Sequence, residues 1–132
     1  LDPFGVVPGR EPTVGAWTDP ARVEVARGLP AGPAYLAEDA GLLVAAGHEP
    51  HVDDLFLWSR LVELGLLDPA PLLDRVRAGG FAAILSEVRL DRLDGAPAYE
   101  RQRWIPPLAE AVLSRYVLDT EATGGIRVYR PR

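Results

Sequence analysis

The hydrophobic positions of this chain fall into short blocks, and most blocks have the three- to four-residue spacing of an amphipathic helix. An acid or a proline precedes each helical block, and in most cases a glycine follows it, as is typical of helix starts and stops. Helices are predicted for residues 20–28, 39–47, 55–64, 69–78 and 105–116.

Strands are predicted where a short run is apolar at consecutive positions or alternates between apolar and polar residues. Ala34–Ala37 is one such run, and a brief extended piece is expected at His51-Val52. Phe81–Leu85 is apolar at every position, which is typical of a central strand covered on both faces. The chain closes with a predicted hairpin of residues 117–122 and 126–130. Strands separated by helices favour an α/β fold: a mixed, mostly parallel sheet with flanking helices and a C-terminal antiparallel hairpin at one edge.

A length of 132 residues suits one domain with its own hydrophobic core. Residues 1–18 contain three prolines and three glycines without an apolar period, so they are expected to be a linker or an extended arm. Residues 19–132 are expected to form the single α/β domain. Within it, residues 86–104 are dense in charge and predict a long surface loop. The first residue is Leu1 rather than methionine, so we expect a piece of a longer protein or a processed product.

The composition excludes several classes of chemistry. The absence of cysteine excludes thiol nucleophiles, disulfides and thiolate zinc sites, and the absence of lysine excludes Schiff bases and the P-loop lysine. The formal net charge is −5, and the arginines between residues 89 and 103 alternate with acids, so nucleic acid is not an expected partner. The longest apolar stretch, residues 40–47, is far shorter than the roughly 20 residues of a membrane-spanning helix, and no signal peptide is visible.

Two acidic pairs, Glu38-Asp39 and Asp53-Asp54, are the candidate ligand-binding residues. Each pair stands before a predicted helix, where a carboxylate can satisfy free backbone N–H groups, so helix capping is the first interpretation. The pairs are also predicted to follow two neighbouring strands, and open α/β sheets most often bind ligands at the carboxyl ends of strands. Four carboxylates would repel a phosphate, so a ligand there is expected to be uncharged or cationic, such as a glycan hydroxyl or a partner's arginine.

His48 and His51 add two imidazoles to these carboxylates, enough in number for a divalent metal. They flank Glu49-Pro50 in a predicted loop instead of lying one turn apart on a helix, so no metal site is predicted. No catalytic residue is predicted either, because the serines lack a G-x-S-x-G elbow and the only histidines are these two. Gly79-Gly80 and Gly124-Gly125 do not form a dinucleotide-binding fingerprint, so no cofactor is predicted.

Four motifs follow one another in an order that resembles a known family. They are Leu36-Ala37-Glu38-Asp39-Ala40-Gly41-Leu42 up to Ala46-Gly47, Val52-Asp53-Asp54-Leu55-Phe56, Leu61-x-x-x-Gly65-x-x-Asp68-Pro69-x-Pro71-Leu72, and Arg77-Ala78-Gly79-x-Phe81. With the closing helix, Tyr116 and the final Tyr129-x-Pro131, residues 30–131 are similar to the soluble C-terminal region of polytopic bacterial membrane glycosyltransferases. The family that they resemble is the dolichyl-phosphate-mannose mannosyltransferase type, glycosyltransferase family 39 and its relatives.

The resemblance implies a non-catalytic accessory domain. Such enzymes use a lipid-phosphate-linked sugar donor, and their catalytic carboxylates lie in loops between early membrane helices, so this chain would carry no catalytic residue of its own. Its partner would be the transmembrane portion of the parent protein, and a neutral glycan or acceptor is a further candidate. The domain would be membrane-tethered on the extracytoplasmic side, with residues 1–18 as the connection. The predicted loop 86–104 is longer and more charged than the family leads us to expect.

Two other interpretations remain open. A free-standing acidic binding or protein-interaction domain without enzymatic activity would have the same composition and fold class. A small hydrolase or a metal enzyme is the third interpretation. Several apolar segments of about 20 residues encoded upstream of Leu1 would favour the accessory domain over both.

Overall fold

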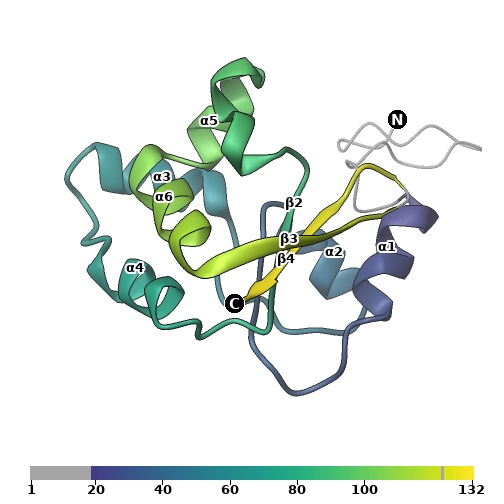
Figure 1. Cartoon of the computed structure of the whole chain (residues 1–132). Helices are drawn as coiled ribbons and strands as arrows, with labels where there is room; N and C mark the ends of the chain where they lie inside the picture. Colours follow the sequence, from purple (N-terminus) through teal and green to yellow (C-terminus); the bar gives the residue numbers. More distant parts are fainter. Residues whose placement is uncertain (1–18, 123) are drawn as a thin grey trace, which may run out of the picture.

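A four-stranded sheet in the order β1-β2-β4-β3 forms the centre of the fold in the computed structural model, which describes residues 19–122 and 124–132 (Figure 1). The strands are β1 (Tyr35–Ala37), β2 (Ala83–Ser86), β3 (Tyr116–Glu121) and β4 (Arg127–Pro131). Helices flank this sheet, so the expected α/β class is confirmed. Strands β3 and β4 form the expected C-terminal hairpin, and β3 is an edge strand.

The prediction of a mostly parallel sheet is wrong. Among the strands of the described residues only β1 and β2 run parallel, whereas β2–β4 and β3–β4 are antiparallel. The physical reason lies at His51-Val52, which forms a bend instead of a strand, so that the chain makes a single crossover from β1 to β2. Val52 packs against the hydrophobic core from that bend without any strand partner.

Strand β2 is the interior strand that the apolar run Phe81–Leu85 predicts. It lies between β1 and β4, with Leu36 opposite Ile84 and Leu85 opposite Val128, and all four of its residues are buried. The strand begins two residues later than the apolar run, because Phe81 packs into the core just before it.

Five of the helices match the predicted ones, with bounds that differ by a few residues. They are α1 (Pro20–Arg27), α2 (Ala40–Ala45), α3 (Leu55–Glu63), α4 (Ala70–Arg77) and α6 (Pro106–Arg115). Helices α3 and α4 end just before Gly65 and Gly79, which have φ values of 74° and 71°, a conformation that glycine adopts without steric cost.

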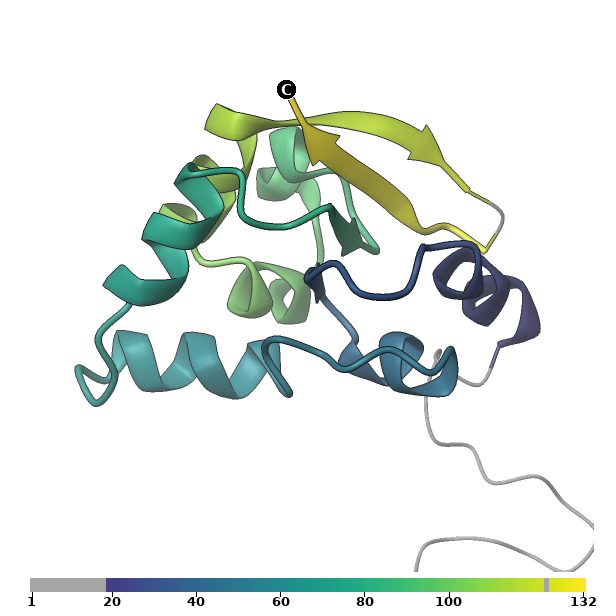
Figure 2. The ribbon, with the colours of Figure 1, turned by 90° about the horizontal axis from the view of Figure 1, so that it is seen from below.

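The alternation of side chains along the strands divides the core into two clusters. Leu36 and Ile84 point to one face of the sheet, where they pack with residues of α4 and α6. Tyr35 and Leu85 point to the other face, toward α1 and α2. Figures 1 and 2 show the same division, with α1 and α2 on one side of the sheet and α3, α4 and α6 on the other.

The prediction of a surface loop at residues 86–104 is wrong in its main feature. The segment contains the 3₁₀ helix η2 (Leu90–Gly95) and the helix α5 (Ala98–Arg103), and it buries Glu100 and Trp104. Part of its charge is neutralised in ion pairs at the protein interior, where Arg103 pairs with Glu38 and Glu87.

The expected arm, residues 1–18, lies outside the described residues, as does Thr123 of the expected hairpin turn. Within residues 19–122 and 124–132, no helix is long and apolar enough to cross a membrane.

Candidate functional site at the carboxyl ends of β1 and β2

The structure gives the four candidate carboxylates different environments. Asp39 is the N-cap of α2 and accepts a hydrogen bond from the Gly41 N–H at 3.0 Å, and Asp54 caps α3 in the same way. Asp53 is exposed, whereas Glu38 is buried and caps no helix. The prediction that both pairs follow neighbouring strands is wrong, because the segment before Asp53 is a bend. No contact in the structure tests ligand binding at these residues, so that assignment stays a prediction.

Glu38 follows β1 directly, and its carboxylate accepts hydrogen bonds from three donors. Its Oε1 atom accepts from Trp104 Nε1 at 2.6 Å and from the Glu87 backbone N–H at 3.0 Å. The Ser86 Oγ atom lies 3.3 Å from Oε1, and its hydroxyl donates to the Val88 carbonyl at 2.7 Å. Its Oε2 atom accepts from Arg103 Nη1 at 3.2 Å. Burying a charged carboxylate is costly unless such donors replace water, so these contacts fix the end of β1 against the end of β2 and α5.

Glu87 adds a second carboxylate at the end of β2. Arg22 of α1 forms an ion pair with its Oε1 atom, and Arg103 Nη1 lies 3.8 Å from its Oε2 atom. The Arg22 Nε–H also donates to the Gly124 carbonyl at 2.8 Å, next to the hairpin turn. This layer of charges connects α1, β2, α5 and the hairpin.

Glu100 of α5 adds a third carboxyl group, which is only 4% exposed. Carboxyl oxygens of Glu38, Glu87 and Glu100 all lie within 4.8 Å of one another. The Oε2 atom of Glu100 is buried and has no hydrogen-bond partner among the described residues. Burial, and then the hydrogen bond and charge of Glu38, raise the pKa of Glu100 to about 8, with Glu87 adding to the shift and Arg103 opposing it.

The cluster therefore holds three carboxyl groups and two guanidinium groups, those of Arg22 and Arg103. A buried excess of one negative charge requires one proton or one cation. The three carboxylates are the ligands that a divalent cation would use. However, Oε1 of Glu38 already accepts hydrogen bonds from Trp104 and from the Glu87 N–H, and Arg103 already lies between Glu38 and Glu87. The geometry fits a proton better than a metal ion.

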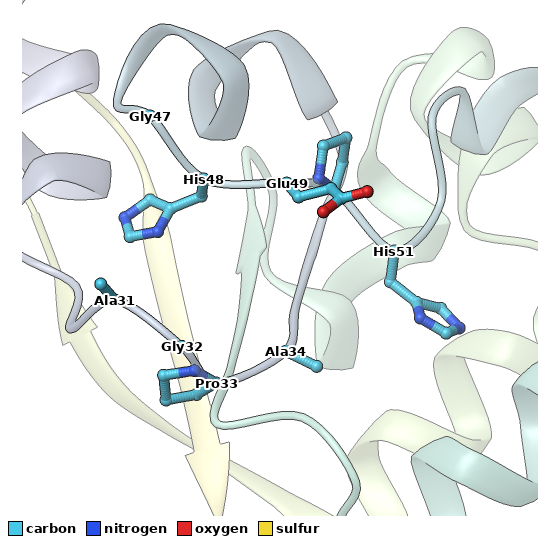
Figure 3. A pocket seen from close by; sticks show the side chains of 9 residues that line it. Ala31, Gly32, Pro33, Ala34, Gly47, His48, Glu49 and His51 are labelled. Carbon is cyan, nitrogen blue, oxygen red and sulfur yellow. The ribbon is translucent and has the colours of Figure 1, made fainter.

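The two histidines lie elsewhere, at the amino end of β1. Together with residues 31–34 and the rest of 47–51, they line an open cavity of about 540 Å³. Figure 3 shows the two imidazole rings pointing away from one another. His48 Nε2 lies 2.9 Å from the Ala26 carbonyl oxygen, and the His51 ring packs edge-on against Phe81. Burial and the nearby charge of Arg75 lower the pKa of His51.

A shallow cleft of about 400 Å³ adjoins the acidic cluster and is lined by Glu87, the residues that follow it and η2. Three arginines, Arg89, Arg92 and Arg127, contribute to its walls. Arg89 is paired with Asp91 through two hydrogen bonds, which lower the pKa of that aspartate, so the cleft carries less free positive charge than its composition suggests.

Sequence reasoning missed Glu87, Glu100, Arg103 and Trp104 as partners of Glu38, because all four fall in the segment that was expected to be a surface loop. The buried Trp104 within a charged segment is the one available signal, since the indole N–H usually finds a partner when it is buried. Comparisons of the chain with models of protein families, with curated proteins and with solved structures found no match.

Proposed function

We propose that this chain is a non-catalytic accessory domain of a membrane-bound glycosyltransferase that uses a lipid-phosphate-linked sugar donor. The resemblance of residues 30–131 to the C-terminal region of such enzymes is the basis of the proposal. The observation that supports it best is that the residues of the shared motifs have structural roles within one fold. Asp39 and Asp54 cap helices, and Gly65 and Gly79 follow the ends of two helices with positive φ.

The hydrogen bonds that occupy the buried Glu38 carboxylate also support a non-catalytic role. A general acid or base must come within hydrogen-bond distance of its substrate. Glu38 is 4% exposed, and its oxygens are occupied by protein donors, so the most deeply placed carboxylate of the motifs acts inside the domain. Catalysis would then belong to the parent protein, whose transmembrane portion would be the partner of this domain on the extracytoplasmic side.

An interaction domain without enzymatic activity is the second candidate, and exposed apolar side chains favour it. Leu57, Leu64 and Leu66 are 52%, 70% and 73% exposed on α3 and the connection to α4. Beside them, Trp58 and Leu67 line a groove of about 480 Å³. Exposed apolar side chains beside a groove are typical of contact surfaces. This feature therefore supports partner binding both by an accessory domain and by a free-standing interaction domain.

The test that separates the two candidates begins with the coding sequence upstream of Leu1. The accessory domain requires several apolar segments of about 20 residues there, and their absence would leave the free-standing interaction domain. In the full-length protein, removal of residues 19–132 should lower sugar transfer without preventing membrane insertion. Transfer or hydrolysis of a lipid-phosphate sugar by the purified chain would overturn the non-catalytic role.

A further inference from the structure

We propose that Glu38 and Glu100 share one proton, and that this proton is a pH-sensitive latch that holds α5 against the carboxyl ends of β1 and β2. The inference rests on the acidic cluster and does not depend on which partner the domain has. It concerns Glu100, whose buried carboxyl group no role described above explains.

The geometry requires a positive charge or a proton beside Glu100. Its carboxyl oxygen lies within 4.8 Å of oxygens of both Glu38 and Glu87, and its Oε2 atom receives no hydrogen bond from any residue that the structure describes. Two ionised carboxylates whose oxygens lie within 4.8 Å of each other in a buried site repel, whereas a proton on one of them removes its charge and supplies an O–H donor for the other. Glu100 is the group that carries the proton, because its Oε2 atom has no donor among the described residues, whereas Glu38 accepts from three donors.

The charged groups that act on Glu100 come from three elements: Glu38 after β1, Glu87 after β2 and Arg103 on α5 itself. Arg22 compensates Glu87 from α1. Helices α3 and η2 also pack against α5. From α3 the Ser59 hydroxyl donates to the Arg103 carbonyl at 2.6 Å, and the charged residues Arg60 and Glu63 pair with each other. The charged side chains of η2 are exposed to solvent: Asp91, Arg92 and Asp94.

Release of the proton leaves two ionised carboxylates within 4.8 Å of each other in a buried site. The repulsion is relieved when Glu100 reaches water, and because Glu100 lies on α5, this requires α5 to move away from the sheet edge. The cleft of about 400 Å³ lies next to this site, since Glu87 and Ala96 line it. The latch thus connects the protonation of one buried acid to the position of α5.

The direction of the pH effect follows from the raised pKa. Glu100 has a pKa of about 8 in the fold, against 4.5 for an ordinary glutamate. A proton is therefore bound by the folded chain and released by the unfolded chain between these values. The stabilising effect of the proton is complete below pH 4.5 and is lost as the pH rises through about 8.

The experiment follows the glutamate carboxyl groups by carbon-detected NMR between pH 5 and pH 10, in the wild-type chain and in the Glu100→Gln variant. A glutamine keeps an N–H donor for Glu38 and removes the titration. We expect one wild-type carboxyl signal to titrate near pH 8 and to be missing from the variant. Hydrogen exchange at residues 98–104, corrected for the intrinsic effect of pH, should rise above pH 8 only in the wild type.

Thermal stability gives a second measurement. From pH 6 to pH 9 the wild type should lose roughly 5 °C or more in melting temperature, whereas Glu100→Gln should lose much less. Glu110→Gln, the same substitution at an exposed position of α6, is the matched control and should follow the wild type. Ordinary titration of Glu100 near pH 4.5, or equal pH profiles for wild type and Glu100→Gln, would overturn the proposal. So would a rise in melting temperature with Mg²⁺, Ca²⁺ or Mn²⁺ at pH 7 that Glu100→Gln abolishes, because the cluster would then be a cation site.

Discussion

The two acidic pairs of this domain, Glu38-Asp39 and Asp53-Asp54, have the same local sequence pattern and different structures. In each pair the second residue caps the following helix. The first residues differ, because Glu38 is buried with three donors around its carboxylate, whereas the Asp53 side chain is exposed and makes no hydrogen bond or ion pair with the described residues. Local pattern thus determines the cap, and tertiary contacts determine what the preceding acid does.

The segment before each pair explains the difference. Glu38 follows β1, which lies parallel to β2, so the carboxyl ends of both strands meet and bring Ser86 and Glu87 beside Glu38. Asp53 follows a bend that has no strand beside it. We therefore expect Glu38 to contribute far more than Asp53 to the stability of the fold.

The largest effect is expected when Glu38 is replaced. Glu38→Ala leaves Trp104 Nε1, the Glu87 N–H and Arg103 without their buried acceptor, and the loss should be about 3–5 kcal/mol of unfolding free energy. Asp53→Ala is the matched control and should change the free energy by less than about 0.5 kcal/mol. Chemical denaturation at pH 7 measures both, and similar losses for the two variants would break the comparison.

A smaller effect is expected from the donor side of the same contact. Trp104→Phe removes the indole N–H that donates to Glu38 and keeps most of the apolar ring, so we expect a loss of about 1.5–3 kcal/mol. Trp58→Phe is the control, because Trp58 is only partly buried and packs at the border of the core. A double-mutant cycle with Glu38→Ala, which removes the acceptor, isolates the interaction energy, and additive losses would contradict a direct contact between Trp104 and Glu38.

The sequence predicted the parts of this fold that depend on neighbouring residues. Helix starts at Asp19, Asp39 and Asp54 depend on contacts within three residues, and the interior strand depends on a continuous apolar run. The hydrogen bonds of the Glu38 carboxylate depend on partners 49 to 66 residues away along the chain, which no local pattern could indicate.

The two wrong predictions, the surface loop at 86–104 and the strand at His51-Val52, have the same origin, because tertiary contacts decide both structures. Residues 86–104 have the charge density of a surface loop, but arginine–carboxylate pairs allow part of that charge to be buried. His51-Val52 is too short for its strand propensity to decide its structure, and the register of a sheet depends on partners that the sequence does not identify. The mostly parallel sheet was predicted wrongly because it required that strand.

The caps should show a moderate and chemically specific effect. Asp39→Ala and Asp54→Ala each remove one side-chain acceptor from a helix start and should cost about 1 kcal/mol. Asparagine at either position should restore most of the loss, because its side-chain oxygen accepts the same hydrogen bond. Thermal unfolding of the four variants measures this series, and a failure of asparagine to restore stability would indicate that the negative charge itself matters.

The smallest effect on stability is expected at Asp53, and it gives the sharpest test of ligand binding. Asp39 and Asp54 use their carboxylates as caps and Glu38 is buried. Asp53 is the member of the two pairs whose carboxylate has no partner among residues 19–122 and 124–132, so it can accept from a ligand hydroxyl or a partner's arginine. Asp53→Asn should therefore unfold within about 0.5 kcal/mol of the wild type. If a neutral oligosaccharide binds here, millimolar concentrations should shift the backbone amide signals of Asp53 and Asp54, and Asp53→Asn should lose those shifts while the rest of the spectrum is unchanged. If the amide signals of Asp39, Asp53 and Asp54 stay unshifted with every saccharide tested, the prediction of ligand binding at both pairs is wrong. Their roles are then the two helix caps and the buried hydrogen bonds of Glu38.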